Sequence, residues 1–346
     1  MNDEFFMRRA LELARKGEGR VNPNPPVGAV VVKDGQILGE GWHERYGGPH
    51  AERIAIEKAR GKDLRGATLY VTLEPCDHYG KTPPCTDLII ESGITRVVVA
   101  LEDPNPLSGN GIKKLRDHGI AVKVGVLREE AAKLCEIFIT YVKYRRPFVA
   151  LKFASTVDGK ISDFRGNSKW ITDHYRLKSH ELRNKYMAIM VGANTVMTDD
   201  PLLTCRLDGG RSPRRVILDG KGKLAGGNWR VFLNDVDVYV FTASDAVYPD
   251  NVKVFRGEWN VDEILIRLYE EGIDSVLVEG GASVLSQFLS VADVVHAFFS
   301  TRVLGKGLSA FENVAYSLDN APRFKVERIE HVENEVYMEL RPCSRE

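Results

Sequence analysis

Four residues near the start of the chain have the types and spacing of a catalytic zinc site. His50 and Glu52 belong to the segment Pro-His-Ala-Glu, and Cys76 and Cys85 belong to a segment that begins Leu-Glu-Pro-Cys. Catalytic Zn²⁺ usually takes three protein ligands and keeps its fourth position for water, whose pKa it lowers towards 7. We therefore predict that His50, Cys76 and Cys85 bind Zn²⁺, and that Glu52, which is not a ligand, is the catalytic acid and base.

The chemistry that such a site performs is hydrolytic deamination. In zinc deaminases the metal activates a water molecule that attacks an amino-bearing ring carbon, and a glutamate moves the proton. Each half of the pattern is weak alone, because His-x-Glu triplets arise by chance and two cysteines can be buried core thiols. The joint pattern, with Pro-Cys at the end of a predicted strand and a second cysteine after Pro-Pro, favours a metal site.

The spacing of the two cysteines departs from the usual deaminase signature. That signature separates them by two residues, whereas Asp77 to Pro84 separate them here. The insert carries Lys81 and Thr82, and a cation with a hydroxyl at the mouth of a pocket suits an anionic substrate. The alternative is a lysine in a solvated loop. His78 lies in the insert but three ligands are already found, and His43 fits core packing and substrate contact equally well.

Composition sets wide bounds on the rest. The chain has 346 residues, 43% of them hydrophobic and 28% charged, which is typical of a soluble globular protein of two or three domains. Its net charge of zero gives no support for nucleic acid or a membrane surface as a partner. The charged start is unlike a signal peptide, and no apolar run approaches the roughly 20 residues of a membrane span. Five cysteines are an odd number for a disulfide framework, so we expect a reducing cytoplasm.

The elements that position the zinc site alternate between strands and helices. We predict a helix over 4–16 and a β-hairpin of 27–32 and 36–41. His50 begins a helix, and Pro75-Cys76 follow a buried strand over 68–73, so the metal-binding segments lie where regular elements begin or end. The remaining predicted elements of this half are helices over 86–91, 112–118 and 128–143 and strands over 96–100 and 120–126.

A basic, helix-breaking segment, Tyr144-Arg-Arg-Pro147, divides the chain into predicted domains of residues 1–145 and 146–346. The second half shows the same alternation of strands and helices, which predicts another mostly parallel α/β sheet. Predicted strands cover 148–154, 187–192, 215–219, 236–242 and 275–279, and predicted helices cover 174–186 and 283–289.

A lysine and a glycine pair are the chemically interesting features of the second half. Lys152 lies on the face of strand 148–154 opposite its large apolar residues. Burying a lone ammonium is costly, so we predict that Lys152 lies in a pocket with Asp199 or Glu279. No Gly-x-Gly-x-x-Gly follows a strand, so the Rossmann fingerprint is absent. Gly280-Gly281 can be a plain turn or a place where backbone N–H groups bind a diphosphate.

Recognisable motifs occur along nearly the whole chain. In the first half they are Asn22-Pro-Asn-Pro-Pro-Val-Gly-Ala-Val-Val, His50-Ala-Glu, Glu74 to Cys85, and Asp103-Pro-Asn-Pro; in the second half they are Lys152 to Lys160, Ser168 to Thr172, Gly192 to Thr195, Thr198 to Arg206, and Val278 to Gly281. This set resembles the bifunctional riboflavin biosynthesis deaminase/reductase family. The loop from Pro106 to Gly111 is slightly shorter than is usual in that family, so the resemblance says little about the contacts of this loop.

The resemblance implies a fold and two consecutive reactions. The fold is α/β, with an N-terminal cytidine-deaminase-like α/β/α domain and a C-terminal dihydrofolate-reductase-like α/β domain. The first reaction removes the 2-amino group of 2,5-diamino-6-ribosylamino-4(3H)-pyrimidinone 5′-phosphate. The second uses NADPH to reduce the ribosyl group and gives 5-amino-6-ribitylamino-uracil 5′-phosphate. Zn²⁺ and NADPH are the implied cofactors, and the preference for NADPH over NADH rests on the resemblance alone.

The resemblance also implies which residues bind each ligand. For the arginines, a surface salt bridge is the alternative interpretation. The implied contacts are Asn24, His43, Lys81, Thr82, Asp103 and Asn105 for the first substrate; Ser168, Arg183, Leu203, Arg206 and Glu279 for the second; Ala154, Trp170, Thr195, Asp199, Gly281, Ala282, Ser283, Val284 and Leu285 for NADPH; and Lys152 with Asp199 as catalytic residues.

Other functions remain open at this point. A zinc deaminase of free nucleosides or of tRNA adenosine would share the first motif, although a tRNA enzyme should have a basic surface. A zinc-stabilised binding module would need a closed site of four ligands, and only three are found. The second half could be a degenerate reductase that only supports the first. We expect a small-molecule substrate, no nucleic-acid or membrane partner, and a homo-oligomer, either a dimer or a tetramer.

Overall fold

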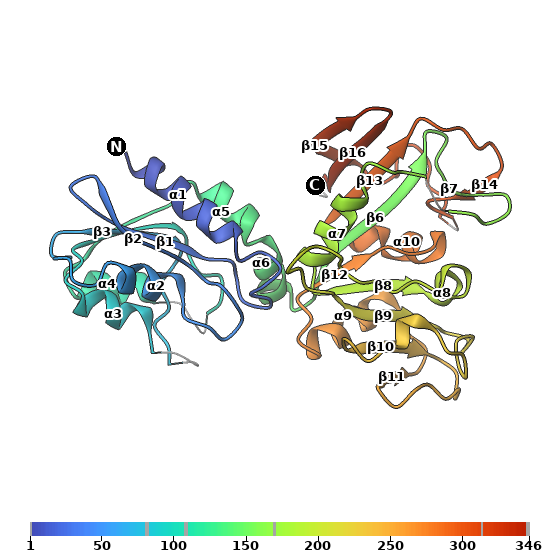
Figure 1. Cartoon of the computed structure of the whole chain (residues 1–346), viewed down its shortest axis with the longest axis horizontal. Helices are drawn as coiled ribbons and strands as arrows, with labels where there is room; N and C mark the ends of the chain where they lie inside the picture. The colour runs from blue at the N-terminus through green and yellow to red at the C-terminus, as the bar shows by residue number, and fades with distance from the viewer. Residues whose placement is uncertain (1, 80–82, 107–109, 169–170, 313, 344–346) are drawn as a thin grey trace. The chain divides into compact units, whose positions relative to one another are not determined.

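The computed structural model of the 346-residue chain describes residues 2–79, 83–106, 110–168, 171–312 and 314–343. The chain forms two compact units, Met1–Arg145 and Arg146–Glu346 (Figure 1). Within the described residues, every helix is too short or too polar to span a lipid bilayer.

The first unit alternates between strands and helices, as the apolar periodicity predicts. A β-hairpin precedes three strands that are joined through helices. The elements are α1 (Asp3–Arg15), β1 (Gly28–Lys33), β2 (Gln36–Trp42), α2 (Ala51–Lys58), β3 (Thr68–Leu73), α3 (Cys85–Glu91), β4 (Arg96–Leu101), α4 (Gly111–Asp117), β5 (Ala121–Val124), α5 (Arg128–Leu134) and α6 (Glu136–Tyr144).

The sheet of the first unit has the order β2-β1-β3-β4-β5 and helices on both faces. Successive residues of β1 point to opposite faces, so Val30 and Val32 pack towards α1 and α5, whereas Ala29 and Val31 pack towards α2, α3 and α4. Figure 1 shows α1 and α5 on one side of the sheet and α2, α3 and α4 on the other. This three-layer α/β/α arrangement is the one predicted for the first half.

One predicted helix is interrupted. The sequence pattern predicts a single helix over 128–143, but α5 and α6 meet at Cys135, whose φ of −93° and ψ of 10° lie outside the helical region. The backbone hydrogen bonds continue across this point, from Cys135 N–H to the Ala131 carbonyl and from Ile139 N–H to the Cys135 carbonyl. A bend therefore separates the two helices, and it places the fully buried Cys135 in the core beneath α1.

The second unit is a larger sheet with shorter connecting helices. Its elements are β6 (Phe148–Thr156), β7 (Lys160–Asp163), α7 (Arg176–Lys185), β8 (Ala188–Gly192), α8 (Ala193–Asp199), β9 (Arg214–Leu218), η1 (Arg230–Phe232), β10 (Val238–Thr242), β11 (Val252–Arg256), α9 (Val261–Glu270), β12 (Ser275–Val278), α10 (Ala282–Phe288), η2 (Leu289–Val291), β13 (Val294–Ser300), β14 (Gly307–Ser309), β15 (Phe324–Val332) and β16 (Glu335–Pro342).

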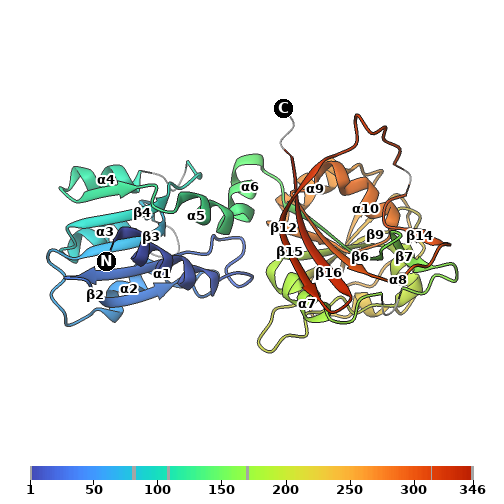
Figure 2. The same cartoon turned by 90° about the horizontal axis from the view of Figure 1, so that it is seen from above.

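The nine strands of the large sheet have the order β11-β10-β9-β8-β12-β6-β13-β16-β15. The first seven in this order pair in parallel, and β16 and β15 extend the sheet with antiparallel pairing. Figure 2 shows β15 and β16, in red, side by side. Because the carboxyl ends of parallel strands share one edge, residues from β6, β8, β9, β10 and β12 can line a single pocket there.

Candidate functional sites

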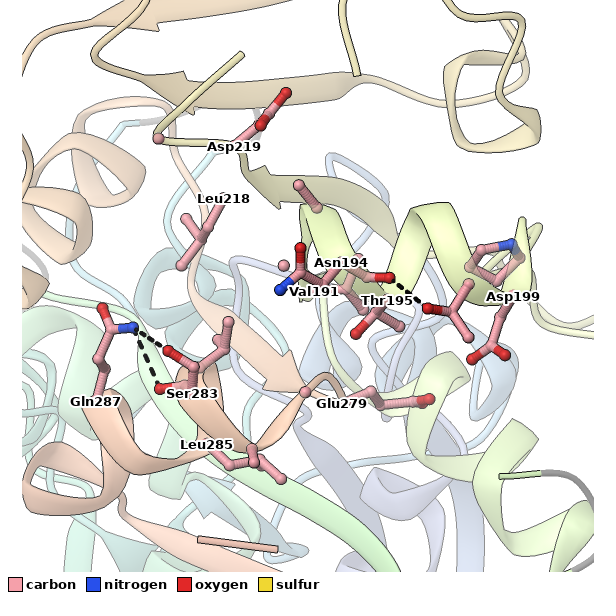
Figure 3. Close-up of a pocket in the computed structure, with 18 of the residues that line it drawn as sticks. Val191, Asn194, Thr195, Asp199, Leu218, Asp219, Glu279, Ser283, Leu285 and Gln287 are labelled. Carbon is pink, nitrogen blue, oxygen red and sulfur yellow. Dashed lines mark hydrogen bonds between the residues drawn. The ribbon is translucent and has the colours of Figure 1, made fainter. Parts of the chain in front are cut away.

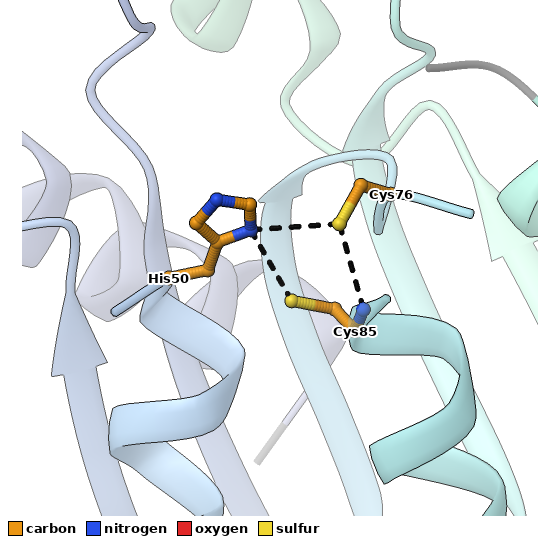
Figure 4. A group of neighbouring side chains, drawn as sticks. All are labelled: His50, Cys76 and Cys85. Atoms are coloured by element: carbon orange, nitrogen blue, oxygen red, sulfur yellow. Dashed lines mark hydrogen bonds between the residues drawn. The ribbon is translucent and has the colours of Figure 1, made fainter. Parts of the chain in front are cut away.

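The three predicted zinc ligands converge in the first unit. His50 directly precedes α2, Cys76 lies in the turn after β3, and Cys85 is the first residue of α3. Their ligand atoms all lie within 4.8 Å of one another (Figure 4). His50 Nδ1 is 3.5 Å from Cys76 Sγ and 3.3 Å from Cys85 Sγ, and the Cys85 backbone N–H donates to Cys76 Sγ.

These side chains have perturbed proton affinities. The hydrogen bond from the Cys85 thiol lowers the pKa of the Cys76 thiol to about 4, against the effect of burial. The same hydrogen bond, reinforced by burial, raises the pKa of Cys85 well above its usual value. The hydrogen bond with Cys76 raises the pKa of His50. Two cysteine sulfurs and an imidazole nitrogen in contact form a donor set that fits tetrahedral Zn²⁺ with one remaining position.

Glu52 lies beside this donor set without belonging to it. Its side chain is in the first turn of α2 and only 3% of the residue is exposed. Burial raises the pKa of the Glu52 carboxyl, and His50 opposes that shift only in part. A buried carboxyl whose pKa is raised can hold a proton closer to neutral pH, which is the property that a general acid and base requires.

Asn24 and His43 join the site from a second direction. The Nδ1 of His43 lies 3.0 Å from the Pro49 carbonyl, which can only accept, so this nitrogen carries the proton. The Nε2 of His43 therefore accepts from Asn24 Nδ2 at 3.2 Å. Burial lowers the pKa of His43, which agrees with a neutral ring. The centres of the His43 and His50 rings are 5.6 Å apart, so the structure brings these residues together at the metal site.

Sequence reasoning missed the role of Glu74. Its carboxylate accepts from the backbone N–H of Asp103 at 3.2 Å and from that of Ile112 at 3.0 Å, and the Asp103 side chain accepts from Asn105 N–H at 2.8 Å. Glu74 therefore links the cysteine segment to the loop of Asp103 and Asn105. The only sequence signal was its place in Leu-Glu-Pro-Cys. Lys81 and Thr82 lie outside the described residues.

Asp77 and Lys114, which sequence reasoning also missed, support the turn after Cys76. Asp77 accepts from the Thr86 hydroxyl at 3.0 Å and from the Lys114 ammonium at 2.6 Å. Lys114 also pairs with Asp87 at 2.6 Å, so one cation on α4 holds both the turn and the first turn of α3. These contacts fix the two segments that carry the cysteines.

The second unit contains a cavity of about 1050 Å³ at the carboxyl ends of its parallel strands. Its size is that of a site for a large cofactor with a substrate. Figure 3 shows Thr195 and Asp199 from α8 and Ser283 and Leu285 from α10 among the residues that line it. The sequence-predicted residues in its lining are Lys152, Ala154, Ser168, Arg183, Thr195, Asp199, Leu203, Glu279, Gly281, Ala282, Ser283, Val284 and Leu285, whereas Trp170 lies outside the described residues.

A buried ion pair forms the charged centre of this cavity. Arg183 Nε and Nη2 donate to the two carboxylate oxygens of Glu279 at 2.9 and 2.8 Å, with 17% and 7% of the side chains exposed. Burial alone would raise the pKa of Glu279, but Arg183 and then Lys152 outweigh it and lower that pKa to about 2. Glu279 is therefore a carboxylate throughout the physiological range.

Lys152 lines the same cavity, close to this ion pair. Burial lowers the pKa of its ammonium and Glu279 opposes the shift, so the two charges are close enough to interact. Among the described residues, however, Lys152 forms no ion pair, because Glu279 is held by Arg183. Its Nζ lies 5.7 Å from the centre of the Phe298 ring. Lys152, Asp199 and Glu279 all line the cavity.

Arg206 lies at an exposed position outside the cavity lining, where it contacts a histidine. Its Nε donates to His180 Nε2 at 3.1 Å, and its backbone N–H lies 3.3 Å from His180 Nδ1. Burial has the largest effect in lowering the pKa of His180, and the nearby positive charges of Arg183 and Arg206 lower it further. His180 precedes Arg183 by three residues on α7, a spacing that places both on one helix face and could have indicated the contact.

The glycines after β12 allow the backbone to pack closely against β8 and α8 at the edge of the cavity. Gly281 has a φ of +62°, where a larger residue would be strained. A side chain at Gly280 would lie 2.8 Å from Val191. The size of the cavity fits an extended dinucleotide. Sequence reasoning missed the rest of the lining, at the ends of β9, β10 and β11.

The fold and the two sites define a class of protein, a zinc-binding deaminase unit joined to a reductase unit. Two family models match the chain: the cytidine and deoxycytidylate deaminase zinc-binding region over residues 1–101, and the RibD C-terminal domain over residues 147–338. The chain belongs to the family of the riboflavin biosynthesis protein RibD, which combines a deaminase and a reductase in one chain. Zn²⁺ and NADPH are the cofactors of these two domains, and the predicted fold class is confirmed.

Relatives from several organisms match the chain over nearly its full length. It is 43% identical to the riboflavin biosynthesis protein RibD of Aquifex aeolicus, over 95% of this chain and 96% of the relative, and 35% identical to that of Escherichia coli, over 98% and 99%. Among solved structures, the diaminohydroxyphosphoribosylaminopyrimidine deaminase/5-amino-6-(5-phosphoribosylamino)uracil reductase of Thermotoga maritima is 62% identical, with a TM-score of 0.97 over 99% of both chains. RibD of Acinetobacter baumannii is 34% identical, with a TM-score of 0.90 and the same coverage.

Proposed function

We propose that the chain catalyses two consecutive reactions in separate domains. Residues 1–145 are the deaminase domain, which removes the 2-amino group of 2,5-diamino-6-ribosylamino-4(3H)-pyrimidinone 5′-phosphate. Residues 146–346 are the reductase domain, which converts the ribosyl group of the deaminated product to a ribityl group. The observation that carries the proposal is that one chain contains both a three-ligand zinc site beside a buried carboxyl and a large cavity with its own charged centre.

In the deaminase domain, His50, Cys76 and Cys85 hold the metal ion. When bound, Zn²⁺ supplies a water molecule of lowered pKa as the nucleophile. The carboxylate of Glu52 accepts the proton of that water and gives it to the ring nitrogen. It then carries a second proton, from the newly added hydroxyl, to the amino group, which leaves as ammonia. The burial that raises the pKa of Glu52 suits both halves of this transfer.

The remaining contacts of the first reaction orient the substrate. Asn24 and the neutral His43 bind the pyrimidine next to the metal, supported by their mutual hydrogen bond. The loop of Asp103 and Asn105, which Glu74 holds in place, closes another side. Lys81 and Thr82 bind the phosphate, a proposal that rests on the chemistry of a cation and a hydroxyl.

In the reductase domain, Lys152 is the proton donor. NADPH, when bound, supplies the hydride. The Lys152 ammonium polarises the carbonyl oxygen of the opened sugar and delivers a proton to that oxygen. Burial lowers the pKa of Lys152, which makes the ammonium a stronger acid, while the Glu279 carboxylate keeps it charged. Asp199, at the end of α8, is the second catalytic residue of this domain.

The substrate phosphate of the second reaction is bound at the Arg183 end of the cavity. Arg183 is already oriented by Glu279 and by its bond to the Thr204 carbonyl at 3.2 Å. Arg206 is held by His180 at an exposed position, so its guanidinium can bind an anion with little loss of packing. Ser168 and Leu203 complete the substrate contacts, and the dinucleotide contacts are Ala154, Trp170, Thr195, Asp199, Gly281, Ala282, Ser283, Val284 and Leu285.

The proposal extends to assembly and location. We infer a homo-oligomer, a dimer or a tetramer, because β15 is at the end of the sheet and exposes Val326 (57%) and Ile329 (64%). Long exposed edge strands with apolar residues pair readily with another chain. A reducing cytoplasm is the proposed location, since Cys76 and Cys85 can bind a metal only while they remain free thiols.

An assay that follows both reactions tests the proposal. With the diaminopyrimidine substrate and NADPH, we expect ammonia release followed by loss of absorbance at 340 nm. Removing zinc with a chelator should stop ammonia release, whereas reduction of the separately supplied deaminated compound should continue. Release of ammonia from cytidine, with none from the phosphoribosyl pyrimidine, would contradict the proposed substrate.

A further inference from the structure

The part of the cavity at the ends of β9, β10 and β11 is not used by the reactions described above. Lys221, Thr242, Ala243 and Gly257 line it. In the strand order, β9 is three positions from β6, which carries Lys152, and β10 is four positions away. With strands about 4.8 Å apart, this end lies roughly 14–19 Å from the strand of Lys152. Figure 3 shows Leu218 and Asp219 well apart from Glu279. A dinucleotide whose hydride donor lies near Lys152 would place its adenosine here.

At this end of the cavity, both carboxylate oxygens of Asp219 already accept hydrogen bonds. Asp219 directly follows β9 and is 1% exposed. Its Oδ1 accepts from Lys223 N–H at 2.8 Å, and its Oδ2 accepts from Leu224 N–H and from the Tyr248 hydroxyl, each at 2.8 Å. In many α/β dinucleotide sites an acid in a comparable place binds the ribose 2′-hydroxyl of NAD. Asp219 instead fixes the turn that follows it, so this acid has little capacity left for a ribose hydroxyl.

The turn that Asp219 fixes presents two lysines to the cavity. Lys221 and Lys223 flank Gly222, whose φ of +68° makes the tight turn possible, and both lysines line the cavity. Lys223 Nζ donates to the side-chain oxygen of Asn194 at 2.8 Å, a contact that orients the ammonium without neutralising it. Lys221 is exposed and, among the described residues, has no hydrogen-bond or ion-pair partner. Glu258 also lines this end, and the buried Asp219 carboxylate is held by its turn, so among the described residues Glu258 is the acid at this end that can oppose a lysine from across the cavity.

We propose that Lys221, supported by Lys223, binds the 2′-phosphate of NADPH and sets the preference for NADPH over NADH. A phosphate monoester carries about 1.5 to 2 negative charges at neutral pH and accepts strong hydrogen bonds from ammonium groups. The 2′-hydroxyl of NADH has no charge to attract the lysines, and Asp219 is occupied. This inference rests on the proposed reductase function, because that function brings the dinucleotide to the cavity.

Binding measurements without turnover test the inference. NADP⁺, NAD⁺, adenosine 2′,5′-bisphosphate and adenosine 5′-phosphate are titrated calorimetrically into the full chain. Lys221→Ala should weaken NADP⁺ and the bisphosphate about tenfold and leave NAD⁺ and the monophosphate unchanged, since one charge-assisted contact is lost. Lys221→Ala/Lys223→Ala should weaken the two 2′-phosphorylated ligands further. The difference between variant and wild type should shrink with added salt.

Two matched variants control for general effects of charge. Lys325→Ala removes an exposed lysine on β15, outside the cavity lining, and should change none of the affinities. Glu258→Gln removes the opposing carboxylate and should strengthen NADP⁺ binding or leave it unchanged. A double lysine variant that keeps the wild-type ratio of NADP⁺ to NAD⁺ affinity would overturn the inference while leaving the reductase function intact. A wild-type chain that binds neither dinucleotide would contradict the reductase function, and the inference with it.

Discussion

The two sites of this chain deal with buried charge in different ways. In the first unit, the ligand atoms of His50, Cys76 and Cys85 lie within 4.8 Å of one another, and the hydrogen bonds among them shift their pKa values. In the second site, Arg183 and Glu279 already neutralise one another, and Lys152 is a further cation in the lining of the cavity. The first site therefore depends on its metal, whereas the second is internally balanced and depends on its own ion pair.

The variant with the largest expected effect, Glu52→Gln, should impair only the first site. Glu52→Gln should lower the rate of deamination about 10³-fold, because the amide cannot accept the proton of the nucleophile. The shape of the side chain is nearly unchanged, so zinc content measured by atomic absorption should equal that of the wild type. Reduction of the deaminated compound, followed at 340 nm, serves as the internal control and should not change. Deamination at close to the wild-type rate would remove Glu52 from the mechanism.

Replacing Lys152 should impair only the second site. Lys152→Met should lower the rate of reduction about 10²-fold, since the proton donor is lost while hydride transfer itself remains possible. Calorimetric binding of NADP⁺ and release of ammonia from the first substrate should both stay at wild-type levels. The matched variant Lys325→Met changes an exposed lysine and should have no effect. Full reductase activity in the Lys152 variant would assign the proton transfer elsewhere.

Removing the neutralising carboxylate tests whether the second site is balanced by its ion pair. Glu279→Gln leaves Arg183 buried without its countercharge, so the free energy of unfolding of the second unit should fall by about 3 kcal/mol. Three of the four tryptophans lie in that unit, so their fluorescence in urea follows its unfolding. Glu271→Gln, which removes the partner of the half-exposed Lys253, should cost less than about 1 kcal/mol. Equal losses in the two variants would contradict a special role for the Arg183–Glu279 pair.

The smallest expected effect is a pH dependence in the second unit. His296 is buried between the hydroxyls of Tyr186 and Tyr337, each 2.8 Å from one ring nitrogen, and burial lowers its pKa well below the usual value. The unfolded side chain takes up a proton near pH 6.5, whereas the folded one stays neutral. Protonation therefore favours the unfolded state, and stability should fall below about pH 6.5 by up to roughly 1.4 kcal/mol per pH unit.

The same urea experiment, repeated between pH 7.5 and 5, isolates this contribution. His296→Gln should flatten the decrease, because the group that takes up the proton is gone. His331→Gln removes an exposed histidine on β15 and should leave the slope as in the wild type. A slope that is identical in all three proteins would show that other groups cause the pH dependence.

The two sites also differ in how much of them the sequence predicts. The zinc ligands come from two short segments around β3, and metal chemistry allows few residue types, so His50, Cys76 and Cys85 could be proposed to meet. The lining of the reductase cavity comes from segments spread between Lys152 and Glu312. Which loops meet there depends on the strand order, and residue patterns alone do not specify that β9, β10 and β11 lie beyond β8.

Local contacts set a second limit on prediction. Arg183 was predicted to bind the substrate phosphate, with a surface salt bridge as the alternative. Its pairing with Glu279 requires α7 to pack near the end of β12, and residues 96 positions apart give no sign of this partner. The fold class followed from the alternation of strands and helices, which is a strong pattern. Strand β15 was missed because most of its side chains are exposed and no apolar alternation marks it. The bend at Cys135 was missed because apolar residues continue through it at helical spacing.

The central claim is that deamination and reduction occur at separate sites and in that order. Its most direct test gives the Glu52→Gln chain NADPH together with either the diaminopyrimidine substrate or its deaminated product, and records absorbance at 340 nm. We predict no NADPH consumption with the diaminopyrimidine and consumption at the wild-type rate with the deaminated compound. Rapid NADPH consumption with the diaminopyrimidine, or none with the deaminated compound, would contradict the claim.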